Sequence, residues 1–250
     1  MESSISVKYW FKNQKGFDEV KRVFSRPFST HRLSLGITAL NTLRIWLSGS
    51  LVFLMTGCSV PDLGDRETYE TALREAKPLG KLSHKRMYGM IMLYVDSNDK
   101  PFTGWIRDDW DSVQIKELGY LKDGQKQGIW MKWHANGVKA SQAQWKNNLL
   151  EGSFQSWHPN GELHGTGQTK DGEVDGEWKS YYPDGQLAEI TLNQNGHLVQ
   201  IKVWRPNGNP CRDSLVSEGN GGYNVYEENG SIKERRIFRQ GVQLREDQSP

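Results

Sequence analysis

Cysteine is almost absent from this 250-residue chain, which has only Cys58 and Cys211. Two cysteines cannot build a disulfide framework. Long apolar runs are also scarce: 36% of the residues are hydrophobic and the mean hydropathy is −0.72, which excludes a protein that spans a membrane several times. What the chain has instead is 26 glycines, 10 tryptophans, 9 tyrosines and 8 phenylalanines. This composition favours short strands joined by tight turns.

Positive charge is concentrated in the first part of the chain. Residues 1–57 carry eight basic and three acidic side chains, whereas residues 58–250 carry 24 basic and 27 acidic ones. The main part of the chain is therefore slightly acidic, and we expect no nucleic-acid partner.

An apolar run at residues 45–56 is followed directly by Gly57 and Cys58. Twelve helical residues span about 18 Å, too short for a hydrocarbon core of about 30 Å but suited to a secretory signal. The segment Met55-Thr56-Gly57-Cys58 resembles the lipobox of bacterial lipoproteins. That resemblance implies signal cleavage between Gly57 and Cys58 and lipid attachment to Cys58. It also implies a membrane-anchored lipoprotein at the cell envelope, and Ser59 implies the periplasmic face of the outer membrane in a Gram-negative cell.

Two other interpretations of this segment stay open. One is a transmembrane anchor over residues 33–54, which would place Arg44 near the middle of the bilayer. The other is a buried strand followed by a structural cysteine. The basic region before the apolar run is long for a signal peptide. We therefore hypothesise that translation starts near Leu40 or Leu43 and that residues 1–40 result from a misassigned start codon.

A repeat with a period of 22 to 24 residues begins after the leader. Each unit has an aromatic residue four positions before a glycine, and that glycine follows Asn or Asp. Such pairs predict type I′ hairpin turns. The aromatic and glycine positions are Trp133 and Gly137, Trp157 and Gly161, Tyr181 and Gly185, Trp204 and Gly208, and Tyr226 and Gly230.

A second turn signal lies half a repeat away, at residues 122–124, 146–148, 170–172 and 194–196. The fold predicted is therefore all-β, an elongated antiparallel meander of tandem hairpins in a single-layer or weakly curled sheet. Three residues before each aromatic position lies another apolar residue, and this odd offset places the two on opposite faces unless a β-bulge intervenes. These residues are Trp130, Phe154, Trp178, Ile201 and Tyr223.

We expect four regions along the chain: a leader at 1–57, a tether with a short helix at 58–86, the hairpin repeats at 87–242 and a disordered tail at 243–250. The turns, with Gly128-Ile129-Trp130 and Gly176-Glu177-Trp178, resemble the bacterial variant of the MORN repeat, in the family often labelled YwqK-type antitoxin. The fourth repeat departs from it, with Ile201 where a Gly-x-Trp tryptophan is expected and Pro210 in the next strand. The family label assigns no binding residue.

No catalytic or metal site is predicted. His134 and His158 occupy equivalent positions two strands apart, about 9.6 Å, which is too far for one metal ion, so we interpret them as solvated residues beside turns. The chain has no nucleophile elbow or phosphate-binding loop. We therefore expect a non-catalytic binding module that needs no cofactor. Its partner would be a protein, bound in an antitoxin-like manner or on a scaffold, or a polymer of the cell envelope. The alternative is binding of a glycan or peptidoglycan through exposed aromatic rows.

Overall fold

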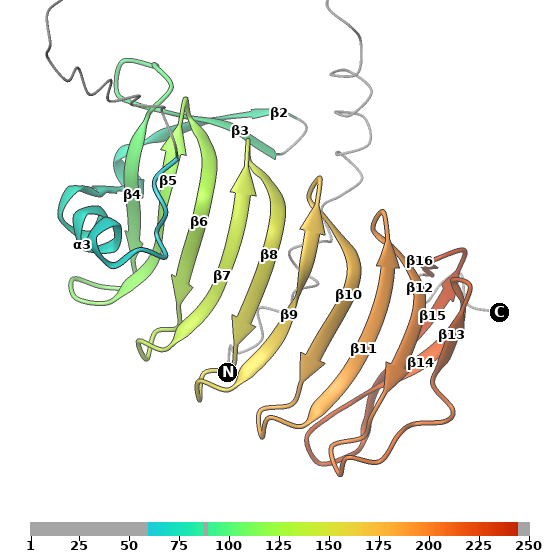
Figure 1. The fold of residues 1–250 in the computed structure, drawn as a ribbon. Coiled ribbons are helices and arrows are strands. Elements are labelled where there is room, and N and C mark those ends of the chain that lie inside the picture. The colour runs from blue at the N-terminus through green and yellow to red at the C-terminus, as the bar shows by residue number, and fades with distance from the viewer. Residues whose placement is uncertain (1–59, 88–89, 245–250) are drawn as a thin grey trace, which may run out of the picture. The chain divides into compact units, whose positions relative to one another are not determined.

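The computed structural model describes residues 60–87 and 90–244 of the chain. It contains a main sheet of fourteen strands and a separate two-stranded sheet (Figure 1). The elements are α3 (Arg66–Glu75), β1 (Lys77–Pro78), the 3-10 helix η1 (Leu79–Lys81), β2 (Ser83–Met87), β3 (Met90–Val95), β4 (Gly104–Asp109), β5 (Ile115–Lys122), β6 (Gln125–Trp133), β7 (Lys139–Lys146), β8 (Leu149–Trp157), β9 (Leu163–Lys170), β10 (Glu173–Tyr181), β11 (Leu187–Gln194), β12 (His197–Val203), β13 (Leu215–Ser217), β14 (Asn220–Tyr226), β15 (Ile232–Arg239) and β16 (Val242–Gln243).

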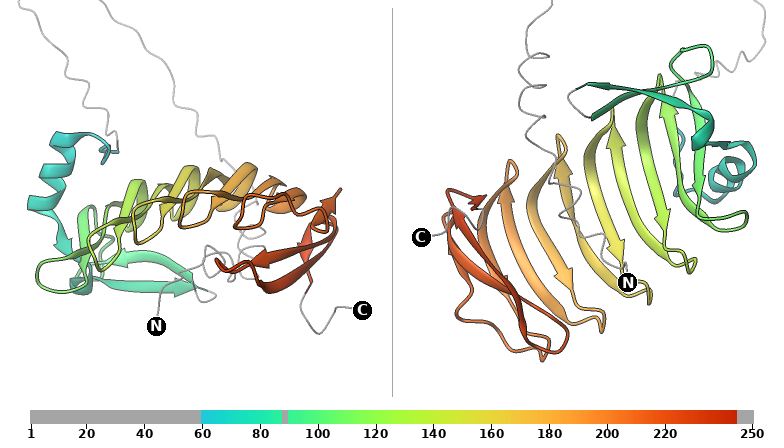
Figure 2. Two further views of the ribbon diagram at one scale, coloured as in Figure 1. Left: turned by 90° about the horizontal axis from the view of Figure 1, so that it is seen from below. Right: turned by 180° about the vertical axis from the view of Figure 1, so that it is seen from behind.

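The main sheet is a meander. From β4 to β16 every strand pairs with its neighbour in sequence, and each of these pairs is antiparallel. Only β1 departs from this pattern, because it pairs in parallel with β4 at one edge. The predicted all-β meander of tandem hairpins is confirmed, and its strands lie side by side in one layer (Figure 2).

The turns beside the aromatic positions differ in type from the prediction. Gly161 has a φ of 93°, but Asn160 does not have a positive φ, as a type I′ turn would require. Instead, the Gly161 N–H donates to the His158 carbonyl at 2.9 Å and the His158 N–H donates to the Glu162 carbonyl at 2.8 Å. These bonds define a type I turn closed by a left-handed glycine, the usual form of a three-residue hairpin loop. The prediction of type I′ turns at these positions was wrong.

Type I′ geometry occurs at the second set of turns. Asp123 and Gly124 have φ values of 51° and 75°, and Asp171 and Gly172 have 51° and 85°. A positive φ at both central residues matches the right-handed twist of the two flanking strands. The two turn types therefore alternate along the meander.

Two faces of the main sheet are distinguished by what covers them. We call the side that α3 covers the helix face, and the side that β2 and β3 cover the hairpin face (Figure 2). Trp130 belongs to the buried cluster of the hairpin face, whereas Met131 and Trp133 belong to that of the helix face. The predicted division of the two apolar rows between opposite faces is therefore confirmed in this strand, although a register irregularity separates Lys132 from Trp133.

Large and small side chains alternate across the hairpin face. The row runs through neighbouring strands in the order Trp130, Ala143, Phe154, Gly167 and Trp178. A Cβ atom on Gly167 would lie 2.5 Å from the ring of Trp178, so the glycine makes room for that ring. The Phe154 and Trp178 ring centroids are consequently only 5.2 Å apart. The row is thus a packed core.

Helix α3 is part of the folded domain. Asp65 caps its N-terminus by accepting a hydrogen bond from the Thr68 N–H at 2.9 Å, and the chain turns into β1 at Lys77. Ala72 of α3 and the preceding Leu63 are buried against the helix face. The segment expected to be a tether contains the expected short helix, but residues 60–86 pack on the main sheet and are more than a spacer.

The C-terminal strands curl over the hairpin face. Val216 and Tyr223 join Ile201 in one buried cluster, and the Leu198 N–H donates to the Gly241 carbonyl at 3.1 Å. Strand β13 is only three residues long and meets β12 at a single residue pair, Ile201 and Val216. The irregular fourth repeat therefore coincides with the place where the sheet bends.

The leader, Gly57, Cys58 and residues 245–250 lie outside the described residues. Within residues 60–87 and 90–244, no helix has both the length and the apolar character needed to cross a membrane.

Candidate binding surface

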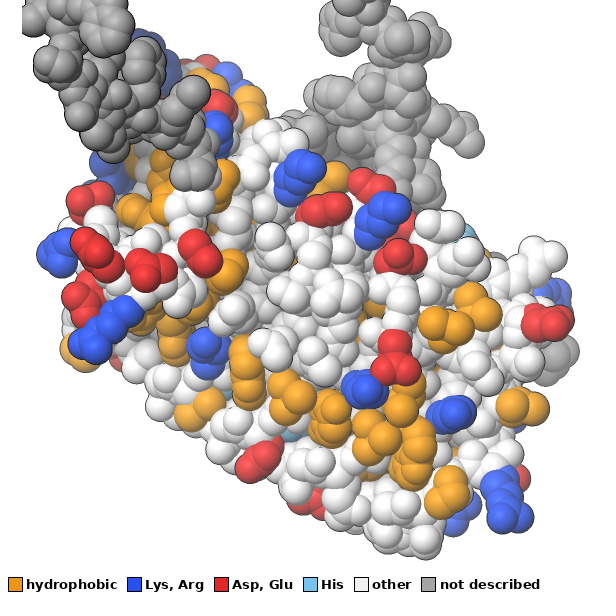
Figure 3. Space-filling view, in the orientation of Figure 1, with side chains coloured by type: hydrophobic (Ala, Val, Ile, Leu, Met, Phe, Trp, Pro, Cys, Tyr) orange, Lys and Arg blue, Asp and Glu red, His pale blue; other side chains and the backbone are white. Residues whose placement is uncertain are grey.

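The aromatic row on the helix face is only half-buried. Strand register shows which face the row occupies. Met131, which α3 covers, pairs with Gln142, and Gln142 pairs with Gln155. Gln155 lies two residues before Trp157, so Trp157 is on the same face as Met131. Figure 3 shows this row of hydrophobic side chains across the sheet. The row consists of Trp133, Trp157, Tyr181 and Trp204.

Tyr226 does not continue this row. It is 9% exposed and lies in the C-terminal cluster, where its hydroxyl oxygen is 2.9 Å from Cys211 Sγ. Cys211 also lies 3.2 Å from the Ser214 hydroxyl. Burial opposes ionisation of Cys211, but hydrogen bonds from Ser214 and Tyr226 outweigh it and lower the pKa of the thiol. These groups hold the curled end of the sheet together.

Helix α3 covers only the first residue of the row. The rings of Tyr69 in α3 and Trp133 are 6.5 Å apart, and both belong to the cluster beneath the helix. The next residue, Trp157, has the Lys139 ammonium 5.2 Å from its ring centroid. In the described part of the chain, neither Tyr181 nor Trp204 contacts another aromatic ring. The row therefore extends beyond the helix.

Uncharged side chains that can form hydrogen bonds lie beside the row. Gln155 in β8 pairs with Thr166 in β9. Two residues along the same strands, Ser153 pairs with Gln168. Figure 3 shows few charges in the centre of this face. We call this set the amide patch: Gln142, Gln144, Ser153, Gln155, Thr166 and Gln168.

Two neighbouring charges on this face compensate one another, while the Lys139 ammonium donates to Gln142 Oε1 at 3.1 Å. Lys179 pairs in register with Thr166, and its ammonium lies 2.9 Å from the Glu177 carboxylate. Among the described residues, Gln144, Gln155 and Gln168 form no side-chain hydrogen bond that would occupy their amides. The patch thus presents neutral donors and acceptors next to aromatic rings.

The two predicted turn histidines have a structural role instead of being merely solvated. His134 Nε2 lies 2.9 Å from the Trp157 carbonyl oxygen, and His158 Nε2 lies 2.9 Å from that of Tyr181. A carbonyl only accepts, so Nε2 carries the proton in both rings. Tyr182 continues the pattern by donating to the Trp204 carbonyl at 2.8 Å. In these three repeats the residue after the aromatic position therefore ties its repeat to the next, which local spacing alone did not reveal.

His164 lies against this series, with its ring centroid 4.5 Å from that of His158. No set of three or more His, Cys, Asp or Glu residues in the described part of the chain is arranged to hold a metal ion. Burial, followed by the nearby His158 and His134, lowers the pKa of His164 to about 4. His164 is therefore neutral at pH 7.

This pKa predicts acid-sensitive stability. Since the folded state binds a proton on His164 less readily than the unfolded state, stability is complete above pH 6.5 and is lost as the pH falls toward 4. We expect urea unfolding at pH 5 to show a loss of about 2 kcal/mol from this residue. The variant His164→Ala has the residue found at the equivalent positions of the adjacent repeats, Ala140 and Ala188. Its free energy of unfolding should decrease between pH 7 and pH 5 by about 2 kcal/mol less than that of the wild-type protein. Equal pH dependence in both proteins would contradict the prediction.

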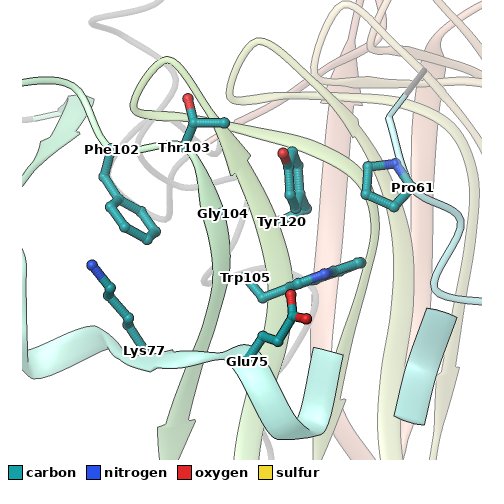
Figure 4. Close-up of a pocket in the computed structure, with 8 residues that line it drawn as sticks. All are labelled: Pro61, Glu75, Lys77, Phe102, Thr103, Gly104, Trp105 and Tyr120. Atoms are coloured by element: carbon teal, nitrogen blue, oxygen red, sulfur yellow. The ribbon is translucent and has the colours of Figure 1, made fainter. Parts of the chain in front are cut away.

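A pocket of about 420 Å³ opens beside α3. Figure 4 shows Phe102, Trp105 and Tyr120 around it, with Lys77 and Glu75 at its lower side. The Lys77 ammonium lies 4.9 Å from the Phe102 ring centroid, so part of the charged lining already has an aromatic partner. The pocket combines aromatic walls with one carboxylate and one ammonium group, and could hold a small ligand with apolar and polar parts.

Comparison with known protein families identifies three consecutive segments, at residues 126–147, 150–171 and 174–195. Each segment covers one hairpin: β6–β7, β8–β9 or β10–β11. They match the MORN repeat variant. In each MORN hairpin the type I turn lies at the centre, and the type I′ turns connect one hairpin to the next. No curated protein matches the chain.

The three MORN hairpins carry most of the candidate surface. The amide patch, Trp133, Trp157 and Tyr181 all fall within the matched segments, whereas Trp204 follows them. MORN repeats on an all-β fold suggest a repeat-based binding or scaffold module, and such folds are typical of non-catalytic binding proteins.

Proposed function

We propose that this chain is a non-catalytic binding module, held at the surface of a bacterial cell envelope by lipid attached to Cys58. The observation that carries the binding role is the half-buried aromatic row on the helix face, which continues past α3 beside the neutral amide patch. Aromatic rings beside adaptable polar side chains are common in recognition surfaces. An antitoxin-like action would be one case of this role, in which the bound partner is neutralised.

The lipid anchor is supported by the sequence Met55-Thr56-Gly57-Cys58 after an apolar run. Two or more acyl chains on one residue hold a protein stably, whereas a single chain does so only marginally. Leu63, five residues after Cys58, is already buried in the fold, so a lipid on Cys58 would hold the main sheet close to the bilayer.

Replacing Cys58 with Ser tests the anchor. We expect the variant to lose acyl labelling and signal cleavage and to accumulate as the uncleaved precursor. Mass spectrometry of the wild-type protein should find the mature N-terminus at Cys58. A Cys58→Ser protein that is processed normally and stays with the membrane would overturn the lipid anchor, but not the binding role.

The binding role is tested by a photo-crosslinking residue placed at Gln155, in the amide patch, in cells that produce the full chain. We expect adducts at Gln155 that disappear when Trp157→Ala is added. Glu228, exposed in the turn between β14 and β15, is the matched control position and should form none. Equal adducts at both positions, or adducts indifferent to Trp157→Ala, would count against the helix face as the binding surface.

A further inference from the structure

The geometry of the helix face points to a linear, neutral, β-1,4-linked glycan as its ligand, lying across the strands along the row from Trp157 through Tyr181 to Trp204. This inference rests on the binding role proposed above and names the class of its partner.

The first observation is the spacing of the rings. Trp157 ends β8, Tyr181 ends β10 and Trp204 follows β12, so successive members are separated by two strands. Two strand spacings are about 9.6 Å. This distance is close to the length of a β-1,4-linked disaccharide, so alternate sugars of an extended chain would reach successive rings.

The second observation is the charge of the surface. The amide patch has no ionised group, and the adjacent Lys179 and Glu177 form an ion pair with each other. Clusters of charge recognise nucleic acids and most acidic or basic proteins, and the patch has no such cluster. The charged group that contacts it is the Lys139 ammonium, which donates to Gln142 Oε1 at 3.1 Å. A neutral polymer is the complementary partner.

The third observation is the chemistry of the patch. Carboxamides both donate and accept hydrogen bonds, as sugar hydroxyl groups do. Gln144, Gln155 and Gln168 are exposed, and in the described part of the chain their amides are not engaged by other side chains. At the Trp157 end of the row, the ring and the nearby amides of β8 and β9 match the apolar CH face and the polar edge of a pyranose.

The position of α3 on the row determines where one end of a bound glycan would lie. Tyr69 packs on Trp133, so the helix occupies the first position of the row. A bound glycan would therefore begin at Trp157 and extend toward Trp204. Six sugars suffice to reach all three rings at a spacing of two sugars per ring.

Calorimetric titration of the full chain in detergent tests this assignment. The probes are β-1,4-linked hexamers of glucose and of N-acetylglucosamine, with the α-1,4-linked glucose hexamer, whose chain curves, as the control. We expect one or both β-1,4 hexamers to bind, the α-1,4 hexamer not to bind, and a dimer to bind at least tenfold more weakly than the hexamer. Trp157→Ala and Tyr181→Ala should each weaken binding by about tenfold.

Matched variants separate the row from the rest of the protein. Phe154→Leu changes a buried ring on the opposite face and should leave glycan affinity unchanged. Gln155→Ala and Gln168→Ala should weaken it severalfold, with little dependence on salt. Failure of both β-1,4 hexamers to bind at millimolar concentration, or affinity unaffected by Trp157→Ala, would overturn the inference. If glycan binding fails and the crosslinked adducts at Gln155 contain a protein, the binding role stands and the glycan assignment is wrong. If neither glycan binding nor adducts at Gln155 are found, the binding role and the glycan assignment are both wrong.

Discussion

Trp130→Ala should destabilise the protein by about 3–5 kcal/mol, the range for removing a fully buried tryptophan. The side chain is 2% exposed and packs on Gly119, where a Cβ atom would lie 2.1 Å from its ring. The Lys126 ammonium also lies 3.8 Å from the ring centroid. Alanine would leave a cavity that the neighbouring residues, Gly119 and Ala143, are too small to fill. Urea unfolding of the full chain measures the loss.

Trp110→Ala is the matched control for that experiment. Trp110 is 46% exposed, and its indole N–H donates to the Trp133 carbonyl at 2.9 Å. Losing one such bond should cost about 1 kcal/mol. Equal losses for the two tryptophan variants would show that the hairpin-face row does not form the main core.

Glu117→Ala should cost about 3–5 kcal/mol, because it removes the anion from a buried cluster and leaves two ammonium groups behind. Glu117 Oε1 lies 2.8 Å from the Lys126 ammonium and 3.5 Å from that of Lys132. Burial alone would raise the pKa of Glu117, but the two lysines lower it to about 2. The stabilisation is therefore complete above pH 4.5 and is lost as the pH falls toward 2.

The exposed pair of Glu177 and Lys179 provides the control for charge removal. The two side chains are 58% and 40% exposed, so Glu177→Gln should change the free energy of unfolding by less than about 1 kcal/mol. If Glu117→Ala cost no more than Glu177→Gln, the buried cluster would not contribute to stability.

Much of the fold could be predicted from local patterns. Glycines after Asn or Asp marked the hairpin turns, and aromatic residues three apart marked the two faces, because a strand alternates sides at every residue. The turn type was mispredicted because Asn and Gly can both take a positive φ, as a type I′ turn requires. The hydrogen bonds of the assembled hairpin determine that only the glycine does so at these turns. The contacts of His134 and His158 reach the next repeat, so they too were invisible to local reasoning.

The sequence by itself determined that the chain is a meander of repeated hairpins with an aromatic residue on each side of the sheet. It did not determine which of those two rows is core and which is surface. Trp130 and Trp133 are equally apolar and occupy equally regular positions, but their burial depends on what packs against each face. Tertiary structure decided this by placing β2 and β3 over Trp130, the C-terminal strands over Ile201 and Tyr223, and α3 over only the first member of the second row. Those elements lie outside the matched repeats, and no repeat pattern encodes where they pack.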